Sequence, residues 1–332
     1  SSVTNMRRMF FETDLFNQPV GNWNTESLQV VSYMFAQTGA FDQSLANWDV
    51  TNVTAMIDMF AGVELSTMNY ENTLIGWAAQ SVQNGVIFDG GMSKYNYGQA
   101  YHARQQLIED YGWTITDGGL IFTEIDSWAD LRAIDNDLNG AYKLMNDLGP
   151  TDPGYETYND TTSFIGWAPI AWGGSSSDKF DGLLDGNGYE IRGLRIKYQN
   201  PQQAAFIARL GENGLITDLG VADYYYRGAG DKSGGLVGIN KGTIQKSYAK
   251  GTMHWDGSST QQLGGLVGRN DEGIIDQTFS AGNIAGHEYV GGLVGINVYG
   301  KVMNSYSNAR VLGTEYSGGL VGYNKDFLDF AK

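Results

Sequence analysis

The sequence predicts a mainly β protein built from two solenoids that follow one another along the chain. Three observations support this fold class. Residues 1–62 repeat with a period of 25, a glycine-rich motif recurs four times after residue 230, and the composition suits tight turns. A fixed period is the signature of a repeat architecture, in which each unit buries its apolar face against the next. The 46 glycines favour short strands joined by turns, because glycine readily adopts positive φ angles.

The first period is carried by large apolar side chains. A Met-Phe pair begins at Met9, Met34 and Met59, and Trp23 and Trp48 keep the same 25-residue step. A unit this short cannot bury its apolar face alone. We therefore expect equivalent residues to stack in adjacent rungs, with the three methionines in one ladder and the two tryptophans in another.

Residues 48–56 read WDVTNVTAM, and together with the repeated Met-Phe and Phe-Asn-Gln segments they resemble the BspA-like leucine-rich repeats of bacterial surface proteins. This resemblance covers residues 1–119, and its last part, 95–119, is similar to the terminal cap of that family. Within the cap, residues 99–110 predict a helix, with Gly112 just past its end.

The second array repeats the sequence Gly-Gly-Leu-Val-Gly-x-Asn. It begins at residues 234, 264, 291 and 318, at steps of 30, 27 and 27. Glycine on both sides of Leu-Val predicts sharp corners between sheet faces. We expect Gly265 and Gly292 to have either positive φ or no room for a Cβ atom. The asparagines at the end of each motif, such as Asn270, are expected to stack their amides on those of the next rung.

The segments after these motifs, 243–249, 274–280 and 302–307, alternate apolar and polar residues, which predicts strands. Short strands at a fixed period with no intervening helices indicate a β-solenoid. The repeated motif is identified as the GLUG motif, and residues 120–332 resemble the GLUG-containing β-helical region of large bacterial adhesins. That resemblance implies a right-handed parallel β-helix in an exported, surface-bound protein.

The two arrays predict two domains. The pair Gly118-Gly119 marks the boundary, so we expect a leucine-rich-repeat domain over 1–119 and a GLUG β-helix domain over 120–332. A short helix should open the second domain, with Ser127 as its N-cap and with Leu131 and Ile134 facing inward.

Charge and composition limit the partners. The net charge of −16 and the sequence pI near 4.5 disfavour nucleic acid, because a phosphate backbone would be repelled. No apolar run is long enough to insert into a membrane, and the absence of cysteine excludes disulfides and thiolate metal sites. Because the chain opens inside a repeat, we interpret it as part of a longer, processed protein that lies extracellularly at the cell surface and continues into further repeats.

Catalytic patterns are not found in the sequence. His287-Glu288 begins like the zinc-binding H-E-x-x-H helix, but Gly291 occupies the position of the second histidine. No G-x-S-x-G elbow is present either. We expect a protein without enzymatic activity.

Two candidate binding features remain. Asp181 and Asp185 flank Gly182 in an acidic chain, which makes them candidate Ca²⁺ ligands, although Asp-Gly sequences also favour plain turns. Carboxylates on β-helices also serve in polysaccharide cleavage. Tyr224, Tyr225 and Tyr226 cannot all point inward along a strand, so at least one is expected to contact a ligand, unless they form a strand-edge cluster.

The function predicted from these features is adhesion, with a protein or glycan on a host or neighbouring cell as the partner. The alternatives are a structural stalk or spacer and, further off, a polysaccharide-acting β-helix enzyme. An exposed patch of aromatic residues and carboxylates would favour binding, a uniformly polar face would favour a stalk, and a grooved cluster of Asp and Arg would favour an enzyme.

Overall fold

The computed structural model describes residues 2–162, 166–173, 178–197, 203–228, 230–255 and 261–325. The chain divides into two compact units, Ser1–Phe122 and Thr123–Lys332. Both contain stacked repeats, and together they make a mainly β protein with many parallel sheets.

The first part of the N-terminal unit (residues 2–62) stacks in rungs that contain no regular strand. Isolated parallel bridges join Asn5 to Val30 and Val30 to Ala55, at the predicted step of 25 residues. The backbone also takes left-handed conformation twice in each repeat. The first set is Arg8, Tyr33 and Asp58, with φ angles of 58°, 59° and 52°, and the second is Glu12, Gln37 and Gly62, with φ angles of 56°, 58° and 74°. These turns interrupt the extended conformation, which explains why the rungs stack without forming β-sheets.

Phenylalanine rings form the centre of these rungs. The rings of Phe10, Phe35 and Phe60 lie one above the next, with centroids 5.6 Å apart at each step. Phe16 and Phe41 form a parallel column with a spacing of 6.2 Å. The 25-residue repeat therefore becomes a continuous aromatic core.

The methionine and tryptophan ladders are only partly buried. Met34, Met59 and Trp48 are buried, whereas Trp23 is half-buried and Met9 is 54% exposed. Met9 lies in the first rung of this chain, which has a neighbouring rung on one side only, and this position accounts for its exposure.

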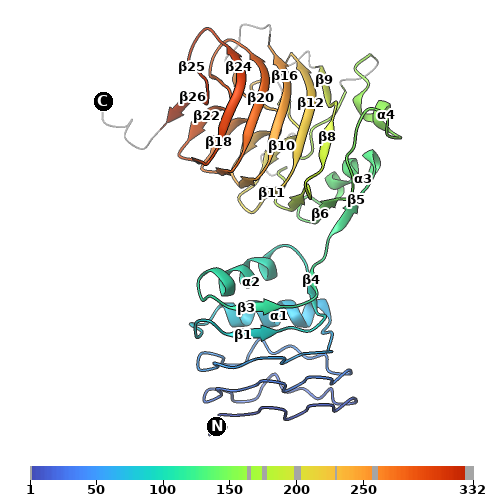
Figure 1. The fold of residues 1–332 in the computed structure, drawn as a ribbon, viewed down its shortest axis with the longest axis vertical. Coiled ribbons are helices and arrows are strands. Elements are labelled where there is room, and N and C mark those ends of the chain that lie inside the picture. The colour runs from blue at the N-terminus through green and yellow to red at the C-terminus, as the bar shows by residue number, and fades with distance from the viewer. Residues whose placement is uncertain are drawn as a thin grey trace. The chain divides into compact units, whose positions relative to one another are not determined.

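Regular elements appear after residue 66 (Figure 1). They are α1 (Thr67–Ala78), β1 (Ile87–Asp89), β2 (Lys94–Tyr95), α2 (Gln99–Glu109), β3 (Thr114–Thr116) and β4 (Gly119–Leu120). The parallel pairs are β1 with β3 and β2 with β4. The predicted cap helix is confirmed as α2, which buries Ala100, Ala103 and Leu107 and is followed by Gly112 at φ 65°. Helix α1 was not predicted.

The second unit coils through four parallel sheets in the part of the chain that is described. The seven-stranded sheet contains β5 (Thr123–Ile125), β6 (Ala141–Leu144), β7 (Leu183–Asp185), β11 (Leu215–Thr217), β15 (Thr243–Gln245), β19 (Ile274–Asp276) and β23 (Lys301–Met303). The six-stranded sheet contains β8 (Glu190–Arg192), β12 (Gly220–Arg227), β16 (Tyr248–His254), β20 (Phe279–Ala285) and β24 (Tyr306–Leu312), with β9 (Arg195–Lys197) also paired to β12.

The five-stranded sheet contains β10 (Ile207–Leu210), β14 (Val237–Asn240), β18 (Val267–Asp271), β22 (Val294–Val298) and β26 (Val321–Lys325). The four-stranded sheet contains β13 (Lys232–Gly234), β17 (Gln262–Gly264), β21 (Val290–Gly291) and β25 (Ser317–Gly318). Each strand pairs with its equivalent one repeat later, and in Figure 1 the strands β8, β12, β16, β20 and β24 lie side by side. The second unit is therefore a stack of parallel rungs, as expected for a solenoid.

The segments predicted as single strands each contain two. Residues 243–249 divide into β15 and the start of β16, and the equivalent segments divide at the same place. Lys246, Gln277 and Asn304, with φ angles of 47°, 53° and 47°, turn the chain from one sheet to the next. This correction could not be read from composition, since none of the three is glycine.

The glycine corners are confirmed, for a steric reason. Neither Gly265 nor Gly292 has a positive φ. A Cβ at Gly265 would lie 2.1 Å from the carbonyl oxygen of Gly292, and a Cβ at Gly292 would lie 2.0 Å from that of Gly319. Adjacent rungs approach too closely here for any side chain.

The asparagine ladder is confirmed as well. The Asn240 amide donates to Asn270 Oδ1 at 2.7 Å, Asn270 donates to Asn297 Oδ1 at 2.8 Å, and Asn297 donates to Asn324 Oδ1 at 2.8 Å. Asn240, Asn270 and Asn297 are buried, so each amide satisfies its neighbour inside the stack.

The beginning of the second unit also contains helices. They are α3 (Trp128–Ala133), the 3₁₀ helix η1 (Ile134–Asn136) and α4 (Tyr155–Asn159). The predicted cap is confirmed, since Ser127 Oγ accepts a hydrogen bond from the Asp130 backbone N–H at 3.3 Å. Leu131 and Ile134 are fully buried, as expected.

Candidate functional site

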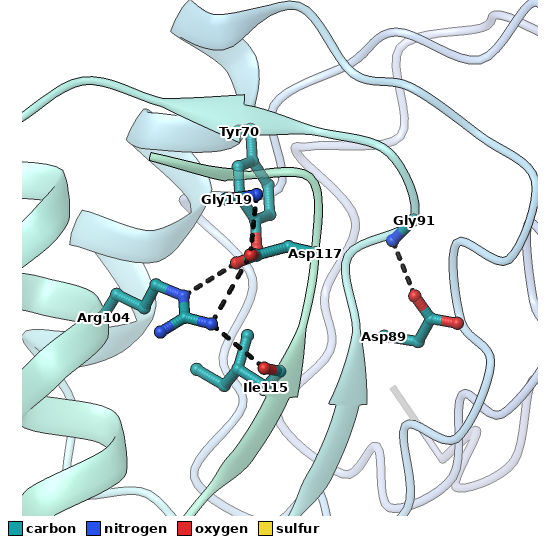
Figure 2. Close-up of polar contacts among 7 residues, drawn as sticks. All are labelled: Tyr70, Asp89, Gly91, Arg104, Ile115, Asp117 and Gly119. Carbon is teal, nitrogen blue, oxygen red and sulfur yellow. Dashed lines mark hydrogen bonds and ion pairs between the residues drawn. The ribbon is translucent and has the colours of Figure 1, made fainter. Parts of the chain in front are cut away.

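A buried polar cluster lies in the cap of the first unit (Figure 2). Arg104, on α2, donates from Nε to Asp117 Oδ2 at 2.8 Å and from a terminal nitrogen to the Ile115 carbonyl at 3.0 Å. Tyr70, on α1, donates its hydroxyl to the same Asp117 oxygen at 2.7 Å. The backbone N–H of Gly119 completes the set at 3.1 Å from Asp117 Oδ1.

The geometry of this cluster indicates a role in holding the fold together. The Asp117 side chain is only 2% exposed, so an external ligand has no access to its carboxylate. Burial, together with the charge of Asp117, raises the pKa of the Tyr70 hydroxyl well above its usual value, so the phenol stays protonated as a donor. The cluster fixes the cap helix to the terminal strands.

The predicted tyrosine site is reduced to one residue. Tyr224 and Tyr226 are buried, and their hydroxyls donate to the carbonyls of Gly265 at 3.1 Å and Gly235 at 3.2 Å. Burial also raises the pKa of Tyr224. Both rings are core residues and cannot contact a ligand, because inward positions alternate along β12. Tyr225, at 45% exposure, points outward and stays a candidate.

The predicted calcium ligands each face a lysine. Asp181 pairs with Lys179 at 2.8 Å, and Asp185 pairs with Lys143 at 3.2 Å. Asp185 Oδ1 also accepts from the Asn187 backbone N–H at 2.8 Å, as in an Asx turn. Within the described ranges, three or more His, Asp or Glu side chains nowhere gather as a metal site would require. Both candidate calcium ligands therefore lie in ion pairs with lysines, and calcium binding stays a prediction.

An exposed aromatic column that the sequence analysis missed lies on the six-stranded sheet. Tyr248, Phe279 and Tyr306 are partners in register on β16, β20 and β24. Their rings are stacked, with centroids 4.7 Å and 5.2 Å apart. Tyr306, on the end strand of the sheet among the described residues, is 53% exposed, and the other two are half-buried. Lys250 covers the column from the next outward position, with Nζ 4.3 Å from the Tyr248 ring centroid.

A signal for this column was present in the sequence. An aromatic residue follows Ser247, Thr278 and Ser305, at the same place in three successive repeats. Its direction could not be assigned, because the turn before each strand shifts the alternation of inward and outward positions.

Comparisons with known proteins match two segments of the chain to described families. Residues 1–97 match a family described as "Mycoplasma protein of unknown function, DUF285". Residues 286–312 match the GLUG motif. That match spans one repeat and includes Tyr306, so the predicted GLUG motif is confirmed for this repeat. The segment that resembles leucine-rich repeats therefore matches a family whose function is unknown.

Two curated relatives match part of the chain. Halomucin from Haloquadratum walsbyi is 32% identical over 148 residues, which are 44% of this chain and 2% of halomucin. A protein of Evansella cellulosilytica named as a Gly-rich membrane protein is 33% identical over 127 residues, which are 36% of this chain and 13% of that protein. The chain thus spans a small part of the relatives it matches. The comparison with solved structures gives no match.

The three histidines lie on different parts of the chain, on α2, on β16 and before β21. His102 lies on α2 with its ring against Tyr97 and Tyr101, and burial lowers its pKa. His287 lies in the loop before β21, where Thr314 donates to its carbonyl at 2.9 Å. In the part of the chain that is described, no helix is both long and apolar enough to cross a membrane.

Proposed function

We propose that this chain is a non-catalytic binding region of a large exported repeat protein at the cell surface, where it serves adhesion to a protein or glycan on another surface. The observation that carries the proposal is the aromatic column of Tyr248, Phe279 and Tyr306, which lies on the outer face of the six-stranded sheet. Exposed aromatic residues on a rigid platform are typical of recognition surfaces.

The relatives support a location at the cell envelope. One carries the words "membrane protein" in its name, and the other matches with 2% of its length, which makes it a far longer protein. A right-handed coil for the second unit and a leucine-rich-repeat origin for the first are parts of the same proposal. Both would suit a long, repetitive surface protein.

A stalk or spacer is the second candidate, and one observation favours it. The rings of the column cover one another, so they also stabilise the stack without any ligand. The discriminating feature is therefore whether the exposed ring edges and hydroxyls contribute to binding.

A binding screen with paired variants tests the proposal. The chain would be screened on a glycan array and on host matrix proteins, with and without Ca²⁺. The variant Tyr306→Ser should weaken binding, whereas Tyr316→Ser is the matched control, since Tyr316 is 54% exposed and stacks on Tyr289 away from the six-stranded sheet. Failure to bind any surface would favour the stalk, and turnover of a polysaccharide would contradict the non-catalytic proposal.

A further inference from the structure

Basic residues are concentrated on the six-stranded sheet. Its strands carry six Lys or Arg residues and two carboxylates, although the whole chain has 21 basic and 37 acidic residues. The basic residues are Arg192, Arg195, Lys197, Arg227, Lys250 and Arg310, and the acidic ones are Glu190 and Asp223. The seven-stranded sheet carries two lysines and three carboxylates, so the excess is not general.

These cations lie on the same outer face as the aromatic column. Their positions alternate with buried residues along each strand, and five of the six are exposed, with Lys250 half-buried above the rings. The register places Arg227 directly beside Lys197, and Tyr225 beside Arg195. Like charges in adjacent positions destabilise a sheet, so the pairing of Arg227 with Lys197 does not itself stabilise this one.

Only part of this charge is neutralised locally. Arg192 pairs with Glu190 and, at 4.0 Å, with Asp147. Arg195 donates from Nε to the Tyr155 hydroxyl, which leaves its charge in place. Among the described residues, neither Lys250 nor Arg310 has a carboxylate within ion-pairing distance. From β9 to β24 the face spans roughly 19 Å, taking about 4.8 Å per strand.

We propose that this face binds an acidic polysaccharide, one that carries carboxylate or sulfate groups, laid across the strands. The proposal rests on the binding function proposed above and names the ligand class for it. Basic side chains on strands that are one or two positions apart in the sheet would pair with the repeated anionic groups of the polysaccharide. The ring edges and hydroxyls of the aromatic column would contact its sugar rings. The net charge of −16 does not prevent this contact, because distant charges are screened beyond about 8 Å at physiological ionic strength.

Single-stranded nucleic acid is the other polyanion to consider, and the ring geometry disfavours it. Proteins that bind single strands stack bases on open aromatic faces. Here the faces of Phe279 are covered by Tyr248 and Tyr306, with interplanar angles of 15° and 5°. The column therefore offers edges rather than faces between rungs.

The test compares two double variants of the full chain, each of which removes two positive charges. Lys250→Gln with Arg310→Gln alters the face, and Lys241→Gln with Lys301→Gln is the matched control outside this sheet. Binding to dextran sulfate, polygalacturonate, neutral dextran of matched length and a single-stranded oligodeoxynucleotide is measured over a range of salt concentrations. Hydrogen exchange verifies that both variants keep the native stack.

We expect the unaltered chain to bind the two acidic polysaccharides and not neutral dextran. The double variant on the face, and not the control, should bind them about tenfold more weakly, and the salt dependence of its binding should correspond to roughly two fewer released counterions. Equal effects of both double variants would overturn the proposal, and so would oligonucleotide binding as tight as that of the polysaccharides. If the chain binds a protein or a neutral glycan in the screen but no acidic polysaccharide, this inference fails and the proposed binding function stands. If it binds nothing at all, the binding function itself fails.

Discussion

In the first unit, neighbouring rungs are joined by backbone hydrogen bonds without regular strands and are packed around a column of aromatic rings, whereas in the second they are joined through regular parallel strands. Residues 2–62 have isolated bridges, backbone hydrogen bonds between rungs such as Phe10 N–H to the Met34 carbonyl at 2.9 Å, and a column of phenylalanine rings. The second unit instead pairs strands of up to eight residues and adds a buried amide ladder.

The difference shows where each array tolerates change. The centre of the first array is filled by aromatic rings, so the large residues of that column are its weak points. A backbone stack depends on close approach, so its weak points are glycines without room for a Cβ and buried amides without water.

The largest effect is expected from Phe35→Ala. Phe35 is fully buried between Phe10 and Phe60, and its loss should cost about 3–5 kcal/mol through the cavity that it leaves. Hydrogen exchange should become faster in residues 2–62 and stay unchanged in the second unit. The control Phe16→Ala, at a half-buried position, should cost less. Equal losses in both units would remove the distinction between them.

Gly265→Ala should destabilise the second unit by about 3 kcal/mol, near the upper end of typical overpacking costs. The new Cβ would lie 2.1 Å from the Gly292 carbonyl oxygen, and the backbone cannot move aside without breaking strand pairs. The equivalent Gly319 has open space around its Cβ position, so Gly319→Ala is the matched control and should leave stability nearly unchanged. Chemical denaturation would measure both, and equal tolerance would contradict the steric account of the corners.

Asn270→Ala should cost about 1–3 kcal/mol, the usual range for leaving buried polar groups unpaired. Asn270 accepts from Asn240 and donates to Asn297, so both neighbours lose a partner. Asn283→Ala on the exposed side of β20 is the control and should change little. Local hydrogen exchange around β14, β18 and β22 would detect the effect. A stable, fully protected variant would show that backbone pairing alone holds the rungs.

Much of the repeat architecture could be predicted from the sequence. The 25-residue step, the glycine corners and the asparagine ladder follow from residues that recur in strict register, and local rules were enough for the Ser127 cap. The missing strands of the first unit and the divided strands of the second were not predictable. In both cases the turn is made by non-glycine residues in left-handed conformation, such as Tyr33 and Gln277, which composition does not reveal.

The candidate site was less accessible to sequence reasoning. Tyr225 was identified with two neighbours that turn out to be core residues. The aromatic column arises from residues 27 and 31 positions apart that meet only across strands, and the basic face likewise combines residues from different strands. Their outward direction depends on the turns at Lys246 and its equivalents, so an error at the turn reverses inside and outside.

The smallest effect is expected from the acidic turn of the second unit, where charges add little to either kind of stack. The hydrogen bond to Asp181 raises the pKa of Lys179, whose side chain is 36% exposed. Pairs this exposed contribute about 0–1 kcal/mol, so Asp181→Asn should change the unfolding free energy by less than about 1 kcal/mol.

Calcium should not change the melting temperature, because the ion takes six to eight oxygen ligands, whereas Asp181 and Asp185 each face a lysine. Calorimetric titration of the chain and of a Lys143→Ala, Lys179→Ala variant would measure this. If calcium binding releases or absorbs heat in the unaltered chain and Asp181→Asn abolishes that heat, the calcium site is supported. The interpretation of these carboxylates as turn residues would then be wrong.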